Sequence, residues 1–146
     1  MTETRSKPII ASGVIIYTVD NNEVRFLLLQ NAEHKTWGFA KGCALENEKI
    51  IETAIREVKE EAGVTLKEED LDKYFSDYSS YLLPNSRQKK ECIIYLCKKS
   101  ISSNMFKCSN EHQDFTWANI RESIKLLGTN QLRRTIIRAN QHIKSY

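Results

Sequence analysis

Three glutamates lie close together in one short stretch of the sequence: Glu57, Glu60 and Glu61. Each residue of a helix turns by about 100°, so these three carboxylates would share an arc of roughly 100° on one helix. Like charges at this spacing repel, and at the edge of a buried face their pKa values rise unless a cation lies between them. Hard oxygen ligands of this kind suit Mg²⁺ or Mn²⁺, and Mg²⁺ usually binds one or two carboxylates together with substrate phosphates. The cluster therefore points to metal-dependent phosphate chemistry.

The element that must carry these glutamates is a helix predicted over Ile50–Ala62. Apolar side chains recur there at helical spacing, Gly63 stands where a C-cap glycine belongs, and Asn47 is the expected N-cap. The glutamates would lie beside the buried stripe, where the helix meets the rest of the domain. An ordinary solvated acidic face is the competing interpretation, because such faces are common on helices.

The residues that flank the cluster decide between these interpretations, because together they fill a known signature. The signature is Gly-x5-Glu-x7-Arg-Glu-U-x-Glu-Glu-x-Gly-U, where U is an aliphatic residue. Its fixed positions are all matched, by Gly42, Glu48, Arg56, Glu57, Val58, Glu60, Glu61, Gly63 and Val64. In these residues the chain resembles the Nudix hydrolases. The resemblance implies an α/β/α sandwich with a mixed β-sheet, and hydrolysis of a diphosphate linkage in a nucleotide-like substrate.

The resemblance also implies which atoms hold the metal. Glu57 and Glu61 would be the main ligands of Mg²⁺ or Mn²⁺, while Glu60 and the Gly42 carbonyl would be further ligands. Metal ions bound there would neutralise phosphate oxygens and lower the pKa of bound water, and that water would attack one phosphorus.

Two further residues of the signature would position the ligands. By the resemblance, Arg56 would pair with Glu48 or with a carboxylate of the helix and so hold the ligands in place. The spacing agrees, because Arg56 and Glu60 form an i, i+4 pair on the predicted helix.

Outside the signature, the chain from about Ser12 to Leu127 resembles the asymmetrical diadenosine tetraphosphate hydrolases of the animal type. The run Glu111–Trp117 is the most specific part of that likeness, and Glu111 would act as a base or as an extra metal ligand. The resemblance implies cleavage of diadenosine tetraphosphate to ATP and AMP. Cations bind phosphates and aromatic faces stack on bases. The residues that would hold the substrate are His34, Lys41, Arg87, Lys89, Lys90, Tyr95 and Phe115.

The chain departs from those relatives next to the predicted metal site. Ala40 stands where they typically carry proline, and Glu46-Asn47 replaces their usual Pro-Gly turn. Asparagine tolerates a left-handed backbone, so the fold should survive the second change.

Other functions stay open on the sequence alone. The run Trp37–Gly42 and the basic last helix are also compatible with an enzyme that removes diphosphate from RNA 5′ ends or decaps RNA. A diphosphoinositol phosphatase would be expected to carry more clustered Lys and Arg. A nucleotide-binding module without catalysis is a different class, but this chain keeps every glutamate of the signature.

Length and composition limit the remaining choices. The chain has 146 residues, 40% of them hydrophobic, and a net charge of +3, which suits one domain over 1–146. No apolar run could span a bilayer, and no Cys/His spacing matches a zinc site. We expect a monomer in the cytoplasm with reduced thiols and no membrane partner. Strands are predicted at Ile9–Val19, Val24–Gln30, Trp37–Phe39, Tyr74–Leu83, Glu91–Lys98 and Asp114–Trp117, and further helices at Ile120–Leu127 and Gln131–Lys144.

Overall fold

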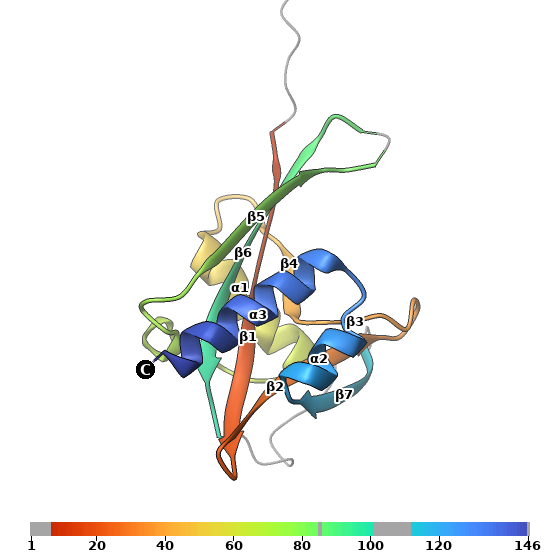
Figure 1. Ribbon diagram of the computed structural model, residues 1–146. Helices are drawn as coiled ribbons and strands as arrows, with labels where there is room; N and C mark the ends of the chain where they lie inside the picture. The colour runs from red at the N-terminus through yellow and green to blue at the C-terminus, as the bar shows by residue number, and fades with distance from the viewer. Residues whose placement is uncertain (1–6, 85, 101–111, 146) are drawn as a thin grey trace, which may run out of the picture.

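The structure is a computed structural model that describes residues 7–84, 86–100 and 112–145, without the side chains of 112 and 113. Within these residues one mixed sheet has helices on both of its faces (Figure 1). The α/β/α arrangement expected from the sequence is thereby confirmed. In chain order the elements are β1 (Ile9–Asp20), β2 (Glu23–Asn31), β3 (Trp37–Gly38), β4 (Ala40–Cys43), α1 (Ile50–Ala62), η1 (Glu68–Asp70), β5 (Asp77–Leu82), β6 (Lys89–Lys98), β7 (His112–Ala118), α2 (Ile120–Leu126) and α3 (Asn130–Lys144).

Strand β1 is the centre of the sheet, because it pairs with three other strands. Its first half pairs antiparallel with β4 and its second half with β2. Along its other edge it runs parallel to β6 for nine residue pairs, from Ile9 with Lys90 to Tyr17 with Lys98. Strand β5 then pairs with β6, and β3 and β7 pair with β2. The parallel β1–β6 pair makes the sheet mixed.

Alternate residues of the strands feed two separate cores. Val14 and Ile16 of β1 belong to the cluster that packs under α1, together with Ala54 and Val58 of that helix. Ile15 belongs to the cluster on the other face, which α2 and α3 cover. Both faces of the sheet are therefore buried in the middle of the molecule. A functional site must then lie at the edges of the sheet or on the flanks of the helices.

Helix α1 has the predicted bounds and ends as expected. Gly63 adopts a left-handed φ of 72°, and its N–H donates to the Lys59 carbonyl at 3.0 Å. The predicted N-cap was wrong: Lys49, not Asn47, occupies that position. Asn47 instead takes a left-handed φ of 65° in the turn before the helix, as its tolerance of that conformation allows.

Two stretches differ from the prediction. Strand β4 was not among the predicted strands, and it is extended because pairing with β1 imposes this backbone on residues with weak strand propensity. The strand expected from Tyr74 begins only at Asp77. The three residues before it form part of a surface groove instead. Among the described residues, no helix is both long enough and apolar enough to cross a membrane.

Candidate metal and phosphate site

Helix α1 and strand β4 meet where the first of the clustered glutamates touches Gly42. The pairing of Ser12 with Gly42 turns Gly42 towards the α1 face of the sheet. A Cβ atom added at Gly42 would overlap the carboxylate of Glu57. Only glycine leaves room for this carboxylate, which explains the glycine at the start of the signature.

The second buried carboxylate is held by the neighbouring residue of the same strand. The Lys41 N–H donates to Oε2 of Glu61 at 2.7 Å. Glu57 and Glu61 are only 8% and 7% exposed, whereas the side chain of Glu60 is 56% exposed. Two carboxylates thus lie in partly desolvated positions against consecutive residues of β4, where a cation would offset their charge.

Arg56 links the glutamates to the loop before the helix. Its Nε donates to Oε2 of Glu48 at 2.8 Å, and its Nη1 donates to Glu57 at 2.9 Å and to Glu60 at 3.0 Å. Its Nη2 also donates to the Cys43 carbonyl at 2.9 Å. These contacts, with the bond to Glu48 foremost, raise the pKa of Arg56. The guanidinium therefore fixes the helix, the loop and β4 in one arrangement.

Glu48, in the loop before α1, is held in this network by several hydrogen bonds. Besides Arg56, it accepts hydrogen bonds from the Thr53 hydroxyl at 2.6 Å and from the Leu45 N–H at 3.0 Å. The bonds from Arg56 and then from Thr53 hold the pKa of Glu48 at about 2. Glu48 thus stays ionised and keeps Arg56 in place at any pH near neutrality.

Two of the lysines predicted to bind substrate, Lys41 and Lys90, lie on the opposite face of the sheet. Strand alternation turns the Lys41 side chain away from Gly42, and the Cβ of Lys41 lies beside Gly13 on that face. Burial raises the pKa of Cys92, and the positive charges of Lys41 and Lys90 oppose this increase, which places both lysines near the thiol. The Lys41 backbone therefore contacts Glu61 while its side chain lies on the face of the sheet that also carries Cys92 and Lys90.

Tyr81 joins these lysines, and it was not predicted from the sequence. On β5, Asp77 and Ser79 contact α3, so Tyr81 shares their face by alternation. The register places Tyr81 directly opposite Lys90, and it is 38% exposed. The pairing of β5 with β6 is the signal that identifies it, and this register cannot be read from the sequence.

The other predicted substrate residues are more scattered. His34 lies in the loop after β2, with 69% of its side chain exposed beside Glu33. Arg87 and Lys89 are exposed near the tip of the β5–β6 hairpin, where Lys89 lies 3.5 Å from Glu91. None of these three is brought to the buried carboxylates.

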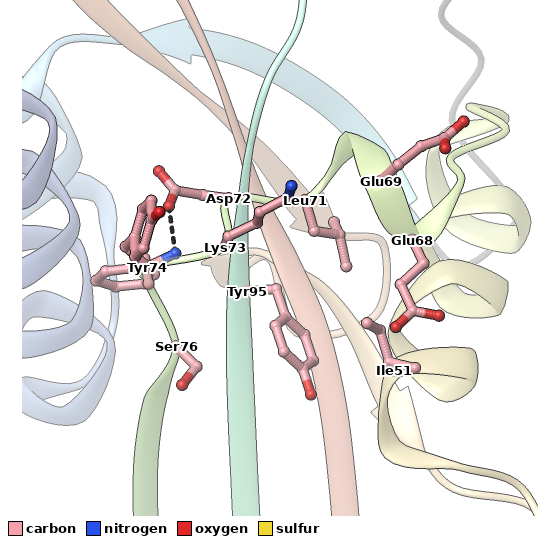
Figure 2. A pocket seen from close by; sticks show the side chains of 10 residues that line it. Ile51, Glu68, Glu69, Leu71, Asp72, Lys73, Tyr74, Ser76 and Tyr95 are labelled. Carbon is pink, nitrogen blue, oxygen red and sulfur yellow. Dashed lines mark hydrogen bonds between the residues drawn. The ribbon is translucent and has the colours of Figure 1, made fainter.

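The two predicted aromatic residues and the last glutamate need separate mention. Tyr95 and Phe115 are half-buried and pack against the core under α1. Tyr95 lies beside Ile51, on the flank of α1 that faces β6 (Figure 2). Glu111 lies outside the described residues.

The donor set suits a hard divalent cation bound by few protein ligands. Glu57 and Glu61 supply two buried carboxylates, and the space at Gly42 is kept open beside one of them. Within the described ranges no three His, Cys, Asp or Glu side chains converge as a complete set of metal ligands. Magnesium does not require such a set, because it keeps several waters and uses substrate phosphates.

Comparisons with known proteins give a family and several similar proteins for this chain. A family model described as "NUDIX domain" matches residues 9–139. The mouse asymmetrical bis(5′-nucleosyl)-tetraphosphatase is 29% identical over 143 residues, covering 92% of this chain and 95% of that protein. The Caenorhabditis elegans protein of the same name is 29% identical over 117 residues, covering 80% and 83%. The crystal structure of a C. elegans Ap4A hydrolase binary complex superposes with a TM-score of 0.83 at 24% identity, covering 94% of this chain and 99% of that one.

Proposed function

The chain belongs to the NUDIX family, and on that premise we propose that it cleaves dinucleoside polyphosphates asymmetrically, with diadenosine tetraphosphate giving ATP and AMP. The observation that carries the proposal is the pair of buried carboxylates, Glu57 and Glu61, held against β4 beside the open space at Gly42. The substrate class is supported by the mouse and nematode relatives named for this activity, which align over most of their lengths.

In this proposal the glutamates of α1 bind Mg²⁺ or Mn²⁺. Glu57 and Glu61 are the main ligands, and Glu60 and the Gly42 carbonyl are further ones. A divalent cation, when bound, neutralises phosphate oxygens and lowers the pKa of a coordinated water. Arg56 orients Glu57 through the hydrogen bond at 2.9 Å. No covalent enzyme intermediate is needed, because water is the nucleophile.

The phosphate chain is proposed to extend from the glutamates around β4 to the other face of the sheet. Lys41 is suited to connect the two faces, because its backbone binds Glu61 while its side chain lies on the face that carries Lys90. Tyr81, opposite Lys90, offers an aromatic face on which a base can stack. Other residues proposed to contact the substrate are His34, Arg87, Lys89 and Glu111, whereas the packing of Tyr95 and Phe115 favours a structural role for both.

The test is hydrolysis of diadenosine tetraphosphate in ¹⁸O-labelled water with Mg²⁺, with products separated and weighed. We expect ATP and AMP, with one label on one product. Glu57→Gln and Glu61→Gln should each lower kcat/KM by about 100-fold or more while the fold is kept. Asp20→Asn, at the exposed end of β1 and outside the site, is the control.

Three results would contradict parts of this proposal. Turnover of triphosphorylated or capped RNA with none of the dinucleotide would move the substrate to RNA 5′ ends. Tight nucleotide binding with no hydrolysis of either substrate would indicate a binding module. Full activity in both glutamine variants would refute the metal ligands.

A further inference from the structure

A groove of about 730 Å³ lies on the flank of α1 that faces β6 (Figure 2). Its volume is within the range of small-molecule sites. Its walls come from α1, η1, β6 and the segment between η1 and β5. Around the helix axis, Ile51 in this wall is turned by roughly 80–120° from Glu57 and Glu61, so the groove is separate from the candidate metal site. The lining residues are Ile51, Glu68, Glu69, Leu71, Asp72, Lys73, Tyr74, Phe75, Ser76 and Tyr95.

Aromatic rings are concentrated in this lining. Tyr95 is half-buried against the core, and Tyr74 is 77% exposed, so it remains accessible to a ligand. Phe75 also lines the groove, but it packs against the core on the other face of the sheet. Aromatic faces carry partial negative charge and attract cations. Burial, and to a smaller extent the carboxylate of Glu68, raises the pKa of Tyr95, so its ring stays neutral and in reach of that carboxylate.

The charge of the lining has the opposite sign to that of the whole chain. Glu68, Glu69 and Asp72 contribute three carboxylates, and Lys73 contributes one ammonium group, which leaves an excess of two negative charges. The chain as a whole carries +3. A phosphate chain would be repelled here, whereas a cation would be attracted both by the carboxylates and by the rings.

The wall that carries Asp72 is already held in place by hydrogen bonds. The Asp72 N–H donates to the Leu96 carbonyl at 2.8 Å, and Oδ1 of Asp72 accepts from the Tyr74 N–H at 2.8 Å. Oδ2 of Asp72 lies 2.9 Å from Nε2 of His142 at the end of α3. The ring of Phe75 lies 5.4 Å from that of His142. A ligand would therefore meet a formed wall and lose little binding energy to ordering it.

We propose that this groove binds an alkylammonium ion, with its methyl or methylene groups against Tyr74, Tyr95 and Ile51 and its charge facing Glu68 and Glu69. The combination of rings with acidic side chains is the chemistry that selects such a cation over a neutral molecule of the same shape. The proposal goes beyond the proposed hydrolysis and does not depend on it, because the groove uses none of the residues of the metal site.

The test uses choline and its neutral isostere 3,3-dimethylbutan-1-ol, without metal or nucleotide. Binding is followed by ¹H–¹⁵N NMR on the isotope-labelled full chain. We expect choline to shift the amides of Leu71, Asp72 and Tyr95, with a Kd of about 1 mM. The neutral isostere should bind at least about fivefold more weakly.

Two variants test the two halves of the lining. Glu68→Gln/Glu69→Gln removes two exposed charges and should weaken choline binding by about fivefold or more, whereas the matched control Asp20→Asn/Glu33→Gln should change it less than about twofold. Tyr74→Leu should weaken binding by about threefold to tenfold. Because Tyr74 and both glutamates are largely exposed, these variants should fold, and their unchanged NMR spectra outside the groove would verify this.

Three outcomes would overturn the proposal. The first is an absence of shifts in the groove at tens of millimolar choline. The second is equal binding of choline and its neutral isostere, which would show that charge is not recognised. The third is choline shifts centred on Gly42 and Glu57, which would place the cation among the other glutamates.

Discussion

The contact between Gly42 and Glu57 sets a steric limit on the candidate metal site. The carboxylate of Glu57 fills the space that any side chain at position 42 would occupy. Glu57 is also tied to Arg56, so it cannot move aside without breaking that pair. The absence of a Cβ atom at Gly42 therefore determines where the buried carboxylate of Glu57 lies.

We predict that Gly42→Ala damages the site more than the fold. The new methyl group would displace the Glu57 carboxylate, and activity should fall by about 10-fold to 100-fold, in the range seen when groups that orient metal ligands are lost. Gly38→Ala is the matched control, because a Cβ there meets only Cδ1 of Leu132, at 3.9 Å. Steady-state kcat/KM of both variants is the measurement, and equal activities would argue against the steric account.

Thr53 supports the network around Arg56 through a hydrogen bond to Glu48. It is fully buried, and its hydroxyl donates to Glu48 at 2.6 Å. Glu48 has its pKa lowered from 4.5 to about 2. A carboxyl group with a lowered pKa stabilises the folded state above its unfolded pKa, and this contribution disappears as pH falls through the folded pKa. The relevant window is therefore from about pH 4.5 down to about pH 2.

We predict that Thr53→Val lowers the free energy of unfolding by about 1–2 kcal/mol at pH 7, since a buried hydrogen bond to a charged group is lost. The difference from the unmodified chain should be widest above pH 4.5 and should narrow towards pH 2, as Glu48 becomes protonated in both proteins. Urea unfolding between pH 2 and 7 measures it. The exposed Thr65→Val is the control, and a difference that does not vary with pH would separate Thr53 from the charge of Glu48.

At the scale of elements, α3 is attached to the edge of the sheet through one buried carboxylate. Asp77 at the start of β5 is 6% exposed, and it accepts hydrogen bonds from the Thr135 hydroxyl at 2.6 Å and from Arg138 at 2.7 Å. Both donors lie one turn apart on α3. This contact holds α3 against the face of β5 that also carries Tyr81.

We predict that Asp77→Asn costs about 1–3 kcal/mol of unfolding free energy, because a buried charged acceptor is replaced by a neutral amide. Arg138→Gln should cost less than about 1 kcal/mol, since its side chain is 57% exposed. Urea midpoints give both values, and Asp20→Asn serves as an exposed control. A larger loss from Arg138 than from Asp77 would contradict this order.

The elements that could be predicted are those whose signals are local. The β1–β2 hairpin follows from its two turn asparagines, which adopt φ values of 50° and 64°, and α1 follows from its apolar stripe and Gly63. Strand β4 could not be predicted, because Ala40–Cys43 is extended only through its pairing with β1. The groove wall before β5 is likewise set by tertiary contacts, and its sequence alone resembled a strand.

In the candidate site, too, features with local signals could be predicted and features set by tertiary contacts could not. The resemblance implied that Arg56 would pair with Glu48 or with a carboxylate of the helix, and in the structure it donates to both kinds of partner. The side on which Lys41 lies and the position of Tyr81 depend on strand register, which the sequence does not contain. The residues predicted to bind substrate therefore depend more on register than the predicted metal ligands, because they come from separate strands rather than from one helix.

At the scale of the whole molecule, helix α1 lies between the candidate metal site and the acidic groove, which suit ligands of opposite charge. One flank presents Glu57 and Glu61 next to β4, where a metal would bring phosphates. The other flank presents the acidic groove, which repels phosphates. The lysines near Cys92 lie on the far face of the sheet. An anionic substrate is thus favoured on only one side of α1.

We predict that Mn²⁺ or Mg²⁺ raises the stability of the whole fold, because the metal binds only the folded arrangement of Glu57 and Glu61. At a metal concentration 100 times its Kd, the gain should be about 2.7 kcal/mol. The thermal midpoint with and without a chelator measures it. Glu57→Gln should lose most of the gain and Glu33→Gln should keep it. An equal gain in both variants would place the metal elsewhere.

The parallel pairing of β1 with β6 joins strands that are far apart in the sequence, so it can form only late in the synthesis of the chain. Ser12 and Ile93, which share a hydrogen bond, are 81 residues apart, whereas β1 and β2 are neighbours that can form a hairpin in about 1–10 μs. At about 5–20 residues per second, a ribosome needs roughly 4–16 s to make the chain between them. Throughout that time the edge of β1 that will pair with β6 is unpaired, and other nascent chains can pair with such an edge. Chaperone capture during this interval would protect the protein until β6 emerges and pairs with β1.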